Sequence, residues 1–417
     1  MARDHKQALG AALAALALGL GACGGDSSRG PEAGAAEELA VYASVPLQGA
    51  QRSLSEAMVN GMRLRLEQSR YRAGRFAIRF EALDDSTAEA ANWDPGQTAS
   101  NARRAVADRT TIAYLGEFNS GASATSIPIL NQGGIPQVSP GNTAVGLTTD
   151  APGADVGEPQ KYYPAGARTY LRVVPNDRVQ GAAMASLMAD EGCRRVFVVH
   201  DPELYGVGLA RNIQHSADEI RLRVLGNRRM NPRAGDYRSL ARTIQARGAD
   251  CVGFAGTTPN NAVQLFKDLA AGVPGAKLFG TDGVAEPTFG DAREGGVPRE
   301  VAERMLITAP TLAPSLYPKA GQEFVAAYVR EYGAQPEPWA IYGYESMDLV
   351  LDAIERAGVR GSDRKAVLAE LRSTRDRASV LGTYDIDENG DTTLTDYGVY
   401  RISGGRLEFD RRIRPRT

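Results

Sequence analysis

The chain has 417 residues, 24% of them charged, with a formal net charge of −2 at pH 7. This near-neutral balance provides no basic stripe of the kind that a phosphate backbone requires, so nucleic acid is not expected as a partner. Outside the N-terminal segment, no apolar stretch approaches the length of a membrane span. The length predicts two domains of ordinary size, each large enough to bury a core.

The first 23 residues predict a bacterial export signal. Arg3, His5 and Lys6 precede an apolar run at residues 8–20, which is too short to cross a bilayer at about 1.5 Å per residue. The run ends in a lipobox that closes at Cys23. We therefore expect residues 1–23 to be the lipoprotein signal peptide, with Cys23 acylated and holding the protein to the membrane by lipid chains alone. An ordinary buried helix is the alternative.

Residues 24–37 offer little to bury and predict a flexible tether. From residue 38, short strand-like runs alternate with longer amphipathic runs, and Ser53 with Glu56 predicts a capping box at the start of the first helix. Strands are expected at residues 39–45, 76–83, 111–115 and 135–138, and helices at 53–68 and 98–108. Such a series predicts a parallel sheet covered by helices on both faces.

The alternation starts again after residue 174 and predicts a second lobe of the same kind. Helices are expected at residues 177–191 and 205–220, strands at 195–200 and 223–230, and two further units up to residue 281. The tail adds helices at 318–332, 342–357 and 364–372, then a hairpin over 383–409 that turns at 388–391. The expected fold class is α/β, with two doubly wound lobes.

Two cysteines remain after Cys23, and both stand at the starting ends of predicted strands. Cys193 precedes the strand at 195–200, and Cys251 opens a strand at 251–255. Adjacent strands lie about 4.8 Å apart, so a disulfide is expected if these two are neighbours, since an exported protein folds in an oxidising compartment. Two buried free thiols are the alternative. A metal site is not expected, because no histidines lie nearby to complete a ligand set.

Small ligands bind beyond the carboxyl ends of the strands in open parallel sheets, which selects a few loops here. In the first lobe, the loops at 116–121 and 139–143 offer hydroxyl groups, among them that of Ser120, and free backbone N–H groups. Both kinds of donor suit a carboxylate. In the second lobe, Asp282 is a lone carboxylate between small residues, suited to a cationic amine. Together they predict a site for a zwitterion between two lobes, although each position alone is more often ordinary loop chemistry.

These loops resemble those of a known family, the type I periplasmic solute-binding proteins typified by the Leu/Ile/Val-binding protein of branched-chain amino acid ABC transporters. The resemblance covers nearly the whole chain from residue 38, and it depends on the order and spacing of several short segments rather than on any one of them. These segments are residues 46–49, 84–85, 115–120, 138–143 and 200–209.

The resemblance implies a role for each site residue. Ser120, in the loop with Asn119, and Thr143 would hold the carboxylate of an amino acid, while the Gly141 carbonyl and Asp282 would meet its ammonium group. A tyrosine that faces the ligand from the second lobe matches Tyr205.

The chain also departs from the family pattern. Thr257 and Thr258 stand where the Leu/Ile/Val binder offers an aromatic side chain, and residues 51–53 stand around its first-loop tyrosine. The loop at 150–168 is longer than usual. Recognition of an amino acid backbone is therefore expected to survive these changes, while leucine specificity is not.

The family fold also implies how the chain is divided. Three crossings are expected near residues 171–174, 308–310 and 378–381, which gives an N-terminal lobe of 38–172 and 309–378 and a C-terminal lobe of 173–308 and 379–417. Hinge closure around the ligand would present one rigid face to an ABC permease, which couples to ATP hydrolysis, since this chain has no phosphate loop with a lysine. A monomer without cofactor is expected.

Parts of the sequence are also compatible with three other interpretations. An extracellular hydrolase could use Ser120 with His200 and Asp201, but no Gly-x-Ser-x-Gly elbow is present, and adjacent residues do not line up easily behind one serine. A ligand sensor that docks to a receptor would use the same cleft. The acidic run at 385–396 imitates a calcium loop, although its strand-like flanks favour a hairpin turn.

Overall fold

The computed structural model describes residues 37–416. The expected signal peptide and Cys23 lie outside the described residues, as does most of the expected tether. Among the described helices, none combines the length and the apolarity that crossing a membrane requires.

The first lobe is built on a six-stranded sheet in the order β2-β3-β1-β6-β7-β8. Its strands pair in parallel except β2, which is antiparallel to β3. The strands are β1 (Glu38–Val45), β2 (Arg72–Ala73), β3 (Phe76–Asp84), β6 (Thr111–Gly116), β7 (Gln137–Ser139) and β8 (Tyr170–Arg172). A small two-stranded unit, β4 (Ser86–Thr87) with β5 (Asn92–Trp93), follows β3.

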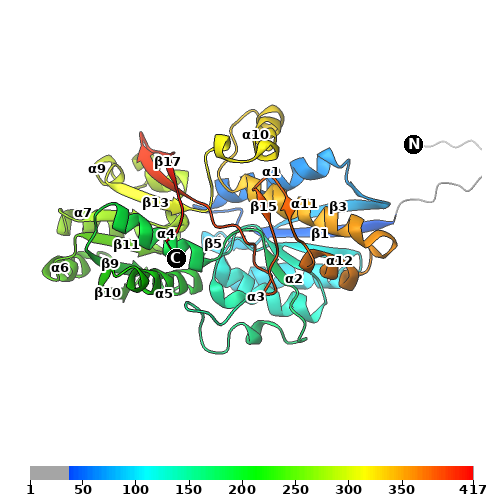
Figure 1. Cartoon of the computed structure of the whole chain (residues 1–417), viewed down its shortest axis with the longest axis horizontal. Helices are drawn as coiled ribbons and strands as arrows, with labels where there is room; N and C mark the ends of the chain where they lie inside the picture. The colour runs from blue at the N-terminus through cyan, green and yellow to red at the C-terminus, as the bar shows by residue number, and fades with distance from the viewer. Residues whose placement is uncertain (1–36, 417) are drawn as a thin grey trace, which may run out of the picture. The chain divides into compact units, whose positions relative to one another are not determined.

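Helices cover both faces of this first sheet (Figure 1). One face packs against α1 (Arg52–Gln68), α10 (Lys319–Tyr332), α11 (Ala340–Ala357) and α12 (Arg364–Arg372). The other packs against α2 (Pro95–Ala107) and α3 (Ser120–Gln132). A Cβ at Gly61 would lie 2.0 Å from the Ala340 carbonyl oxygen, and one at Gly343 would lie 2.0 Å from that of Met58. These glycines therefore let the backbones of α1 and α11 touch.

The expected capping box at the start of α1 is wrong. The helix begins at Arg52 after Gln51, which makes no side-chain cap hydrogen bond. The Ser53 hydroxyl has no hydrogen-bond partner in the described structure, and Glu56 instead pairs with Arg52 at 2.7 Å. With Ser53 as N-cap the first helical residue would be Leu54, so the helix starts two residues earlier than the motif predicts, and Ser53 stands inside it.

The second lobe is built on a seven-stranded sheet in the order β10-β9-β11-β12-β13-β16-β17. Its parallel part comprises β9 (Arg195–His200), β10 (Arg223–Arg229), β11 (Cys251–Ala255), β12 (Lys277–Gly280) and β13 (Met305–Ala309). Two antiparallel strands, β16 (Tyr397–Ser403) and β17 (Arg406–Ile413), complete it.

Helices cover both faces of this second sheet. The helices α4 (Asp177–Asp190) and α5 (Leu204–Glu219) cover one face. The other face carries α6 (Arg238–Ala246), α7 (Ala262–Gly272) and the short α8 (Pro287–Gly290) and α9 (Arg299–Ala302). The α/β class with two lobes is confirmed.

The C-terminal hairpin differs from the expectation. It is formed by β16 and β17, and it turns at Gly404 and Gly405, which have positive φ of 56° and 82°. Residues 388–391 form a separate turn, in which Asp387 accepts the backbone N–H groups of Asn389 and Asp391 at 2.8 and 2.9 Å. The acidic, glycine-containing segment does signal a turn, but a local one.

The segment between α12 and β16 packs with the first lobe. The short strands β14 (Arg377–Ala378) and β15 (Thr383–Tyr384) pair here. Val380, Leu381, Tyr384 and Ile386 belong to the same buried core as α1 and α11. The division of the chain at residue 378 stays a prediction, and this packing favours a third crossing nearer to residue 395.

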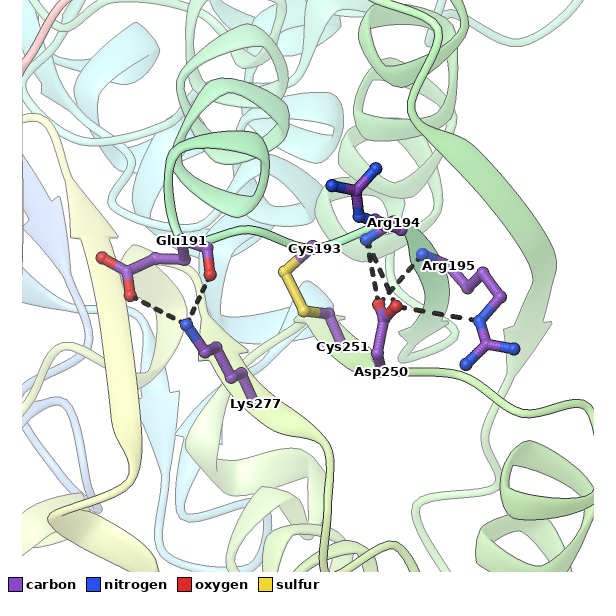
Figure 2. Close-up of a disulfide and its surroundings, with 7 residues drawn as sticks. All are labelled: Glu191, Cys193, Arg194, Arg195, Asp250, Cys251 and Lys277. Atoms are coloured by element: carbon purple, nitrogen blue, oxygen red, sulfur yellow. Dashed lines mark hydrogen bonds and ion pairs between the residues drawn. A yellow bond between two sulfur atoms is a disulfide. The ribbon is translucent and has the colours of Figure 1, made fainter.

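Cys193 and Cys251 form a disulfide with Cα atoms 5.8 Å apart (Figure 2). Cys251 opens β11, which lies next to β9 in the sheet, as the sequence argument required. Asp250 lies beside the two sulfur atoms. Its carboxylate accepts the backbone N–H groups of Arg194 and Arg195, so it belongs to this turn rather than to a metal site.

Candidate ligand-binding pocket

One pocket is lined by loops from both lobes. These loops follow the carboxyl ends of strands, and in each sheet the pocket lies near the point where the strand order reverses. In the first sheet β1 lies between β3 and β6, and in the second sheet β9 lies between β10 and β11. Parallel sheets bind ligands at such switch points. The cavity itself has a volume of about 30 Å³, and the figure rises to about 450 Å³ only when the space open to solvent is included. Its lining includes all seven residues that the sequence suggested: Asn119, Ser120, Gly141, Thr143, Tyr205, Thr257 and Asp282.

The first-lobe side presents hydroxyl groups and the N-terminus of α3. Ser120 is the first residue of this helix, so the N–H groups of its first turn have no partner inside the helix. The Ser120 hydroxyl oxygen accepts the backbone N–H groups of Thr143 and Ala144 at 3.3 and 3.1 Å, which leaves the hydroxyl hydrogen available for donation. Asn119 precedes the helix, and its buried side-chain oxygen has no hydrogen-bond partner among the residues that the structure describes.

Gly141 lies where only a glycine fits. A Cβ at this position would lie 2.4 Å from the Phe118 ring. The backbone N–H groups of Gly141 and Asn142 donate to the Ser139 hydroxyl at 3.1 and 3.0 Å. The Ser139 hydroxyl in turn donates to the Glu117 carbonyl at 2.9 Å. This chain of bonds fixes the loops after β6 and β7 against each other.

The second-lobe side presents carboxylates. Asp282 follows β12, and the Tyr205 hydroxyl donates to its Oδ1 at 2.6 Å. Burial raises the pKa of Asp282 above its usual value, and the Tyr205 hydrogen bond opposes that rise. At the neighbouring Gly283 a Cβ would lie 2.3 Å from the Gly256 carbonyl oxygen, so the loops after β11 and β12 touch through their backbones. The Tyr205 hydrogen bond and the contact between these two loops therefore hold Asp282 in place at the pocket wall.

Four more lining residues lie in loops that follow the expected strands: Phe118, Asn142, Glu203 and Gly283. Three lining residues were not predicted: Leu54, Glu286 and Trp339. Gln51 also lines the pocket, although the sequence marked it only as a departure from the family. Phe118 and Trp339 pack edge to face, with ring centroids 5.2 Å apart. The Trp339 indole N–H and the Gln51 side-chain oxygen are buried without a hydrogen-bond partner in the described structure. For Glu203 and Glu286 a signal existed, since both lie in loops that follow parallel strands.

The residues of the imagined hydrolase triad have structural partners. Asp201 accepts the backbone N–H groups of Glu203 and Thr257, both at 3.0 Å, and therefore ties the loop after β9 to the loop after β11. The His200 ring nitrogen lies 2.7 Å from the Asp201 carbonyl oxygen. Neither residue belongs to the pocket lining.

Two further buried acids support the crossing between the lobes. Asp177, the first residue of α4, donates its backbone N–H to the Thr143 carbonyl at 2.9 Å. Burial raises the pKa of its carboxyl group to about 8; the Thr143 hydroxyl opposes this rise, and the Asp282 carboxylate adds to it. Asp391, from the calcium-like run, pairs with buried Arg172 at 2.6 Å and accepts from Asn176 at 2.8 Å. Its oxygens are therefore used in an ion pair.

Side chains from the two lobes also meet outside the pocket. The Trp93 indole N–H donates to Glu203 Oε2 at 3.3 Å. The long loop at 150–168 reaches α5, where Asp155 pairs with Arg211 at 2.6 Å. A Cβ at Gly153 would lie 2.1 Å from the side-chain nitrogen of Asn212. This loop therefore packs against the second lobe.

Comparison with known proteins identifies related chains. Residues 43–406 match a family model described as periplasmic binding protein. An amino acid binding protein of Pseudomonas aeruginosa is 25% identical over 308 residues, which cover 74% of this chain and 76% of that protein. A Leu/Ile/Val-binding protein homolog 1 of Brucella abortus is 26% identical over 317 residues, covering 75% of this chain and 77% of that protein.

Solved structures share the fold. A leucine binding protein, LivK, of Thermotoga maritima superposes with a TM-score of 0.77 at 24% identity, covering 90% of this chain and 99% of that chain. A solute binding protein of an ABC transporter from R. palustris, in complex with benzoate, has a TM-score of 0.72 at 19% identity, covering 91% of this chain and 97% of that chain. At these identities the likeness shows the architecture alone.

Proposed function

Because the chain belongs to the periplasmic binding protein family, we propose that it captures an amino acid or amino-acid-like ligand in this pocket and delivers it to an ABC permease. The observation that carries the proposal is the asymmetry of the pocket. A helix N-terminus with Ser120 and Thr143 lines one side, and the Asp282 carboxylate lines the other. A small zwitterion is complementary to that arrangement.

In this proposal the ligand carboxylate lies at the start of α3. It accepts the Ser120 and Thr143 hydroxyl groups, with Asn119 beside them. Free N–H groups at a helix start are a ready-made site for such an anion. The indole N–H of Trp339 is a further buried donor without a partner among the described residues.

The ligand ammonium group lies between Asp282 and the Gly141 carbonyl. The Tyr205 hydroxyl holds the Asp282 carboxylate from the side, and Thr257 lines the same wall. Burial disfavours the charged form of Asp282, and an ammonium partner would favour it.

The protein works outside the cytoplasm in this proposal, with Cys23 as its lipid anchor and the described body as a monomer. Closure of the lobes about the three crossings hides the ligand and forms the face that the permease recognises. The contacts of Trp93 with Glu203 and of Asp155 with Arg211 join the lobes and so support the closed form.

The test is a thermal-shift screen of the full chain against amino acids, amino acid amides and small organic acids. A ligand that binds only the folded state raises the melting temperature. We expect zwitterionic amino acids to raise it, and their decarboxylated and deaminated analogues to fail. Stabilisation by organic acids that lack an amine, with none by amino acids, would contradict the proposal.

A further inference from the structure

We propose that the pocket selects an amino acid with a basic side chain, and that Glu286 is the residue that recognises the second positive charge. This inference rests on the proposed function, because it assigns Asp282 to the α-ammonium group. It concerns the lining residue that follows Asp282 by four positions in the same loop.

Glu286 is a buried acid without a cationic partner. It is 1% exposed, and among the described residues no cationic side chain acts on its carboxyl group. The Thr288 hydroxyl donates to its Oε2 at 3.3 Å, and the Thr258 hydroxyl also acts on this carboxyl group. Burial raises its pKa to about 7. A carboxyl group that is held away from water in this way gains most from a ligand that supplies the missing positive charge.

The charge of the whole lining points in the same direction. Three carboxylates, Glu203, Asp282 and Glu286, line the pocket, and no lysine, arginine or histidine within residues 37–416 does. Glu203 already accepts Asn260 at 2.8 Å and Trp93 at 3.3 Å. A neutral zwitterion supplies one positive charge, to Asp282, and leaves Glu286 uncompensated.

The opposite wall suits the rest of such a ligand. Leu54, Phe118 and Trp339 line the pocket from the first lobe and can cover the methylene stem of a long side chain. Beside them, the buried Gln51 oxygen has no hydrogen-bond partner in the described structure and is free to accept one from the ligand. Apolar walls with a carboxylate and a neutral acceptor fit a stem that ends in an ammonium or guanidinium group.

The experiment compares L-lysine and L-arginine with L-norleucine, which has the stem of lysine without its terminal nitrogen. The chain has two tryptophans, one in the pocket lining and one bonded to Glu203, so intrinsic fluorescence reports binding. We expect at least one basic amino acid to bind at least tenfold more tightly than norleucine. In Glu286→Gln that advantage should disappear, with norleucine affinity equal or higher, and Glu300→Gln, an exposed glutamate of α9, should keep it.

The outcomes separate this inference from the proposed function. If norleucine or leucine binds the unmodified chain as tightly as the basic amino acids, the selectivity is refuted while amino acid capture stands. If basic amino acids bind Glu286→Gln unchanged, Glu286 is not the determinant and the inference fails. If no amino acid binds at all, both proposals fail. The comparison of ligands on the unmodified chain does not depend on whether the variant folds.

Discussion

The two sides of the pocket are built in different ways. On the first-lobe side, Ser120 is already bonded to the backbone of a neighbouring loop, and the helix start provides fixed donors. On the second-lobe side, Asp282 and Glu286 are buried carboxyl groups whose pKa values burial raises, to about 7 for Glu286. The first side is thus preorganised, whereas the second lacks a positive charge that a ligand can bring.

The strongest test of this difference is Asp282→Asn. The amide keeps the shape of the side chain and can still accept the Tyr205 hydroxyl, but it removes the charge. Loss of one partner from a buried charge pair costs about 2 to 5 kcal/mol, or roughly 30-fold to several thousand-fold in affinity. Isothermal titration of the best amino acid ligand measures this loss.

The matched control is Asp236→Asn, which removes the same charge from an exposed position of the second lobe. It should leave the affinity within about twofold. An Asp282→Asn variant that folds normally and keeps full affinity would remove Asp282 from the site.

The pH dependence of stability tests Glu286 without any ligand. Its pKa rises from 4.5 to about 7 in the fold, so its protonated form is favoured there. The stability that this group contributes is present below pH 4.5 and is lost as the pH rises towards about 7. At 1.36 kcal/mol per pKa unit, the loss is on the order of 3 kcal/mol.

Urea unfolding of the unmodified chain and of Glu286→Gln, at pH 5 and at pH 8, measures this loss. Since glutamine does not titrate, the variant should gain stability relative to the unmodified chain as the pH rises. An equal difference between the two proteins at both pH values would show that Glu286 does not resist ionisation.

On the first-lobe side we expect a smaller effect, from Ser120→Ala. The change removes one donor to the ligand carboxylate and leaves the N–H groups of Thr143 and Ala144 without their acceptor. A loss of about 1 to 3 kcal/mol in binding free energy follows, because each unmet buried hydrogen bond costs about that much. Ser100→Ala, at an exposed position of α2, is the control. An unchanged dissociation constant would exclude Ser120 from the site.

The sequence predicts the lobes and the loops of the site better than it predicts the lining. Parallel strands end at one edge of a sheet, so locating β6 and β12 places Ser120 and Asp282 at the ligand-binding edges of their two sheets. That the two edges line one pocket follows from the family resemblance and not from the strand positions. Trp339 could not be found in this way. It stands just before α11, and only the close packing of α1 and α11 brings it to the pocket. The capping box at Ser53 failed because a local motif does not fix where a packed helix begins.

The smallest expected effect lies outside the pocket, where the loop at 150–168 meets α5. Asp155 and Arg211 pair at 2.6 Å, but both side chains are nearly half exposed, at 48% and 47%. Water screens such pairs, and each contributes only about 0.2 to 1 kcal/mol of stabilisation. If this contact favours closure, Arg211→Ala should weaken ligand binding by less than about fivefold, mainly through faster dissociation of the ligand. Added salt should weaken ligand binding by the unmodified chain by a similar factor, because salt screens the ion pair. Stopped-flow fluorescence measures the dissociation rate. The double variant with Asp155→Ala should add nothing to the single change, because either one already breaks the pair. A tenfold loss would contradict this assignment, because one exposed ion pair is too weak to account for it.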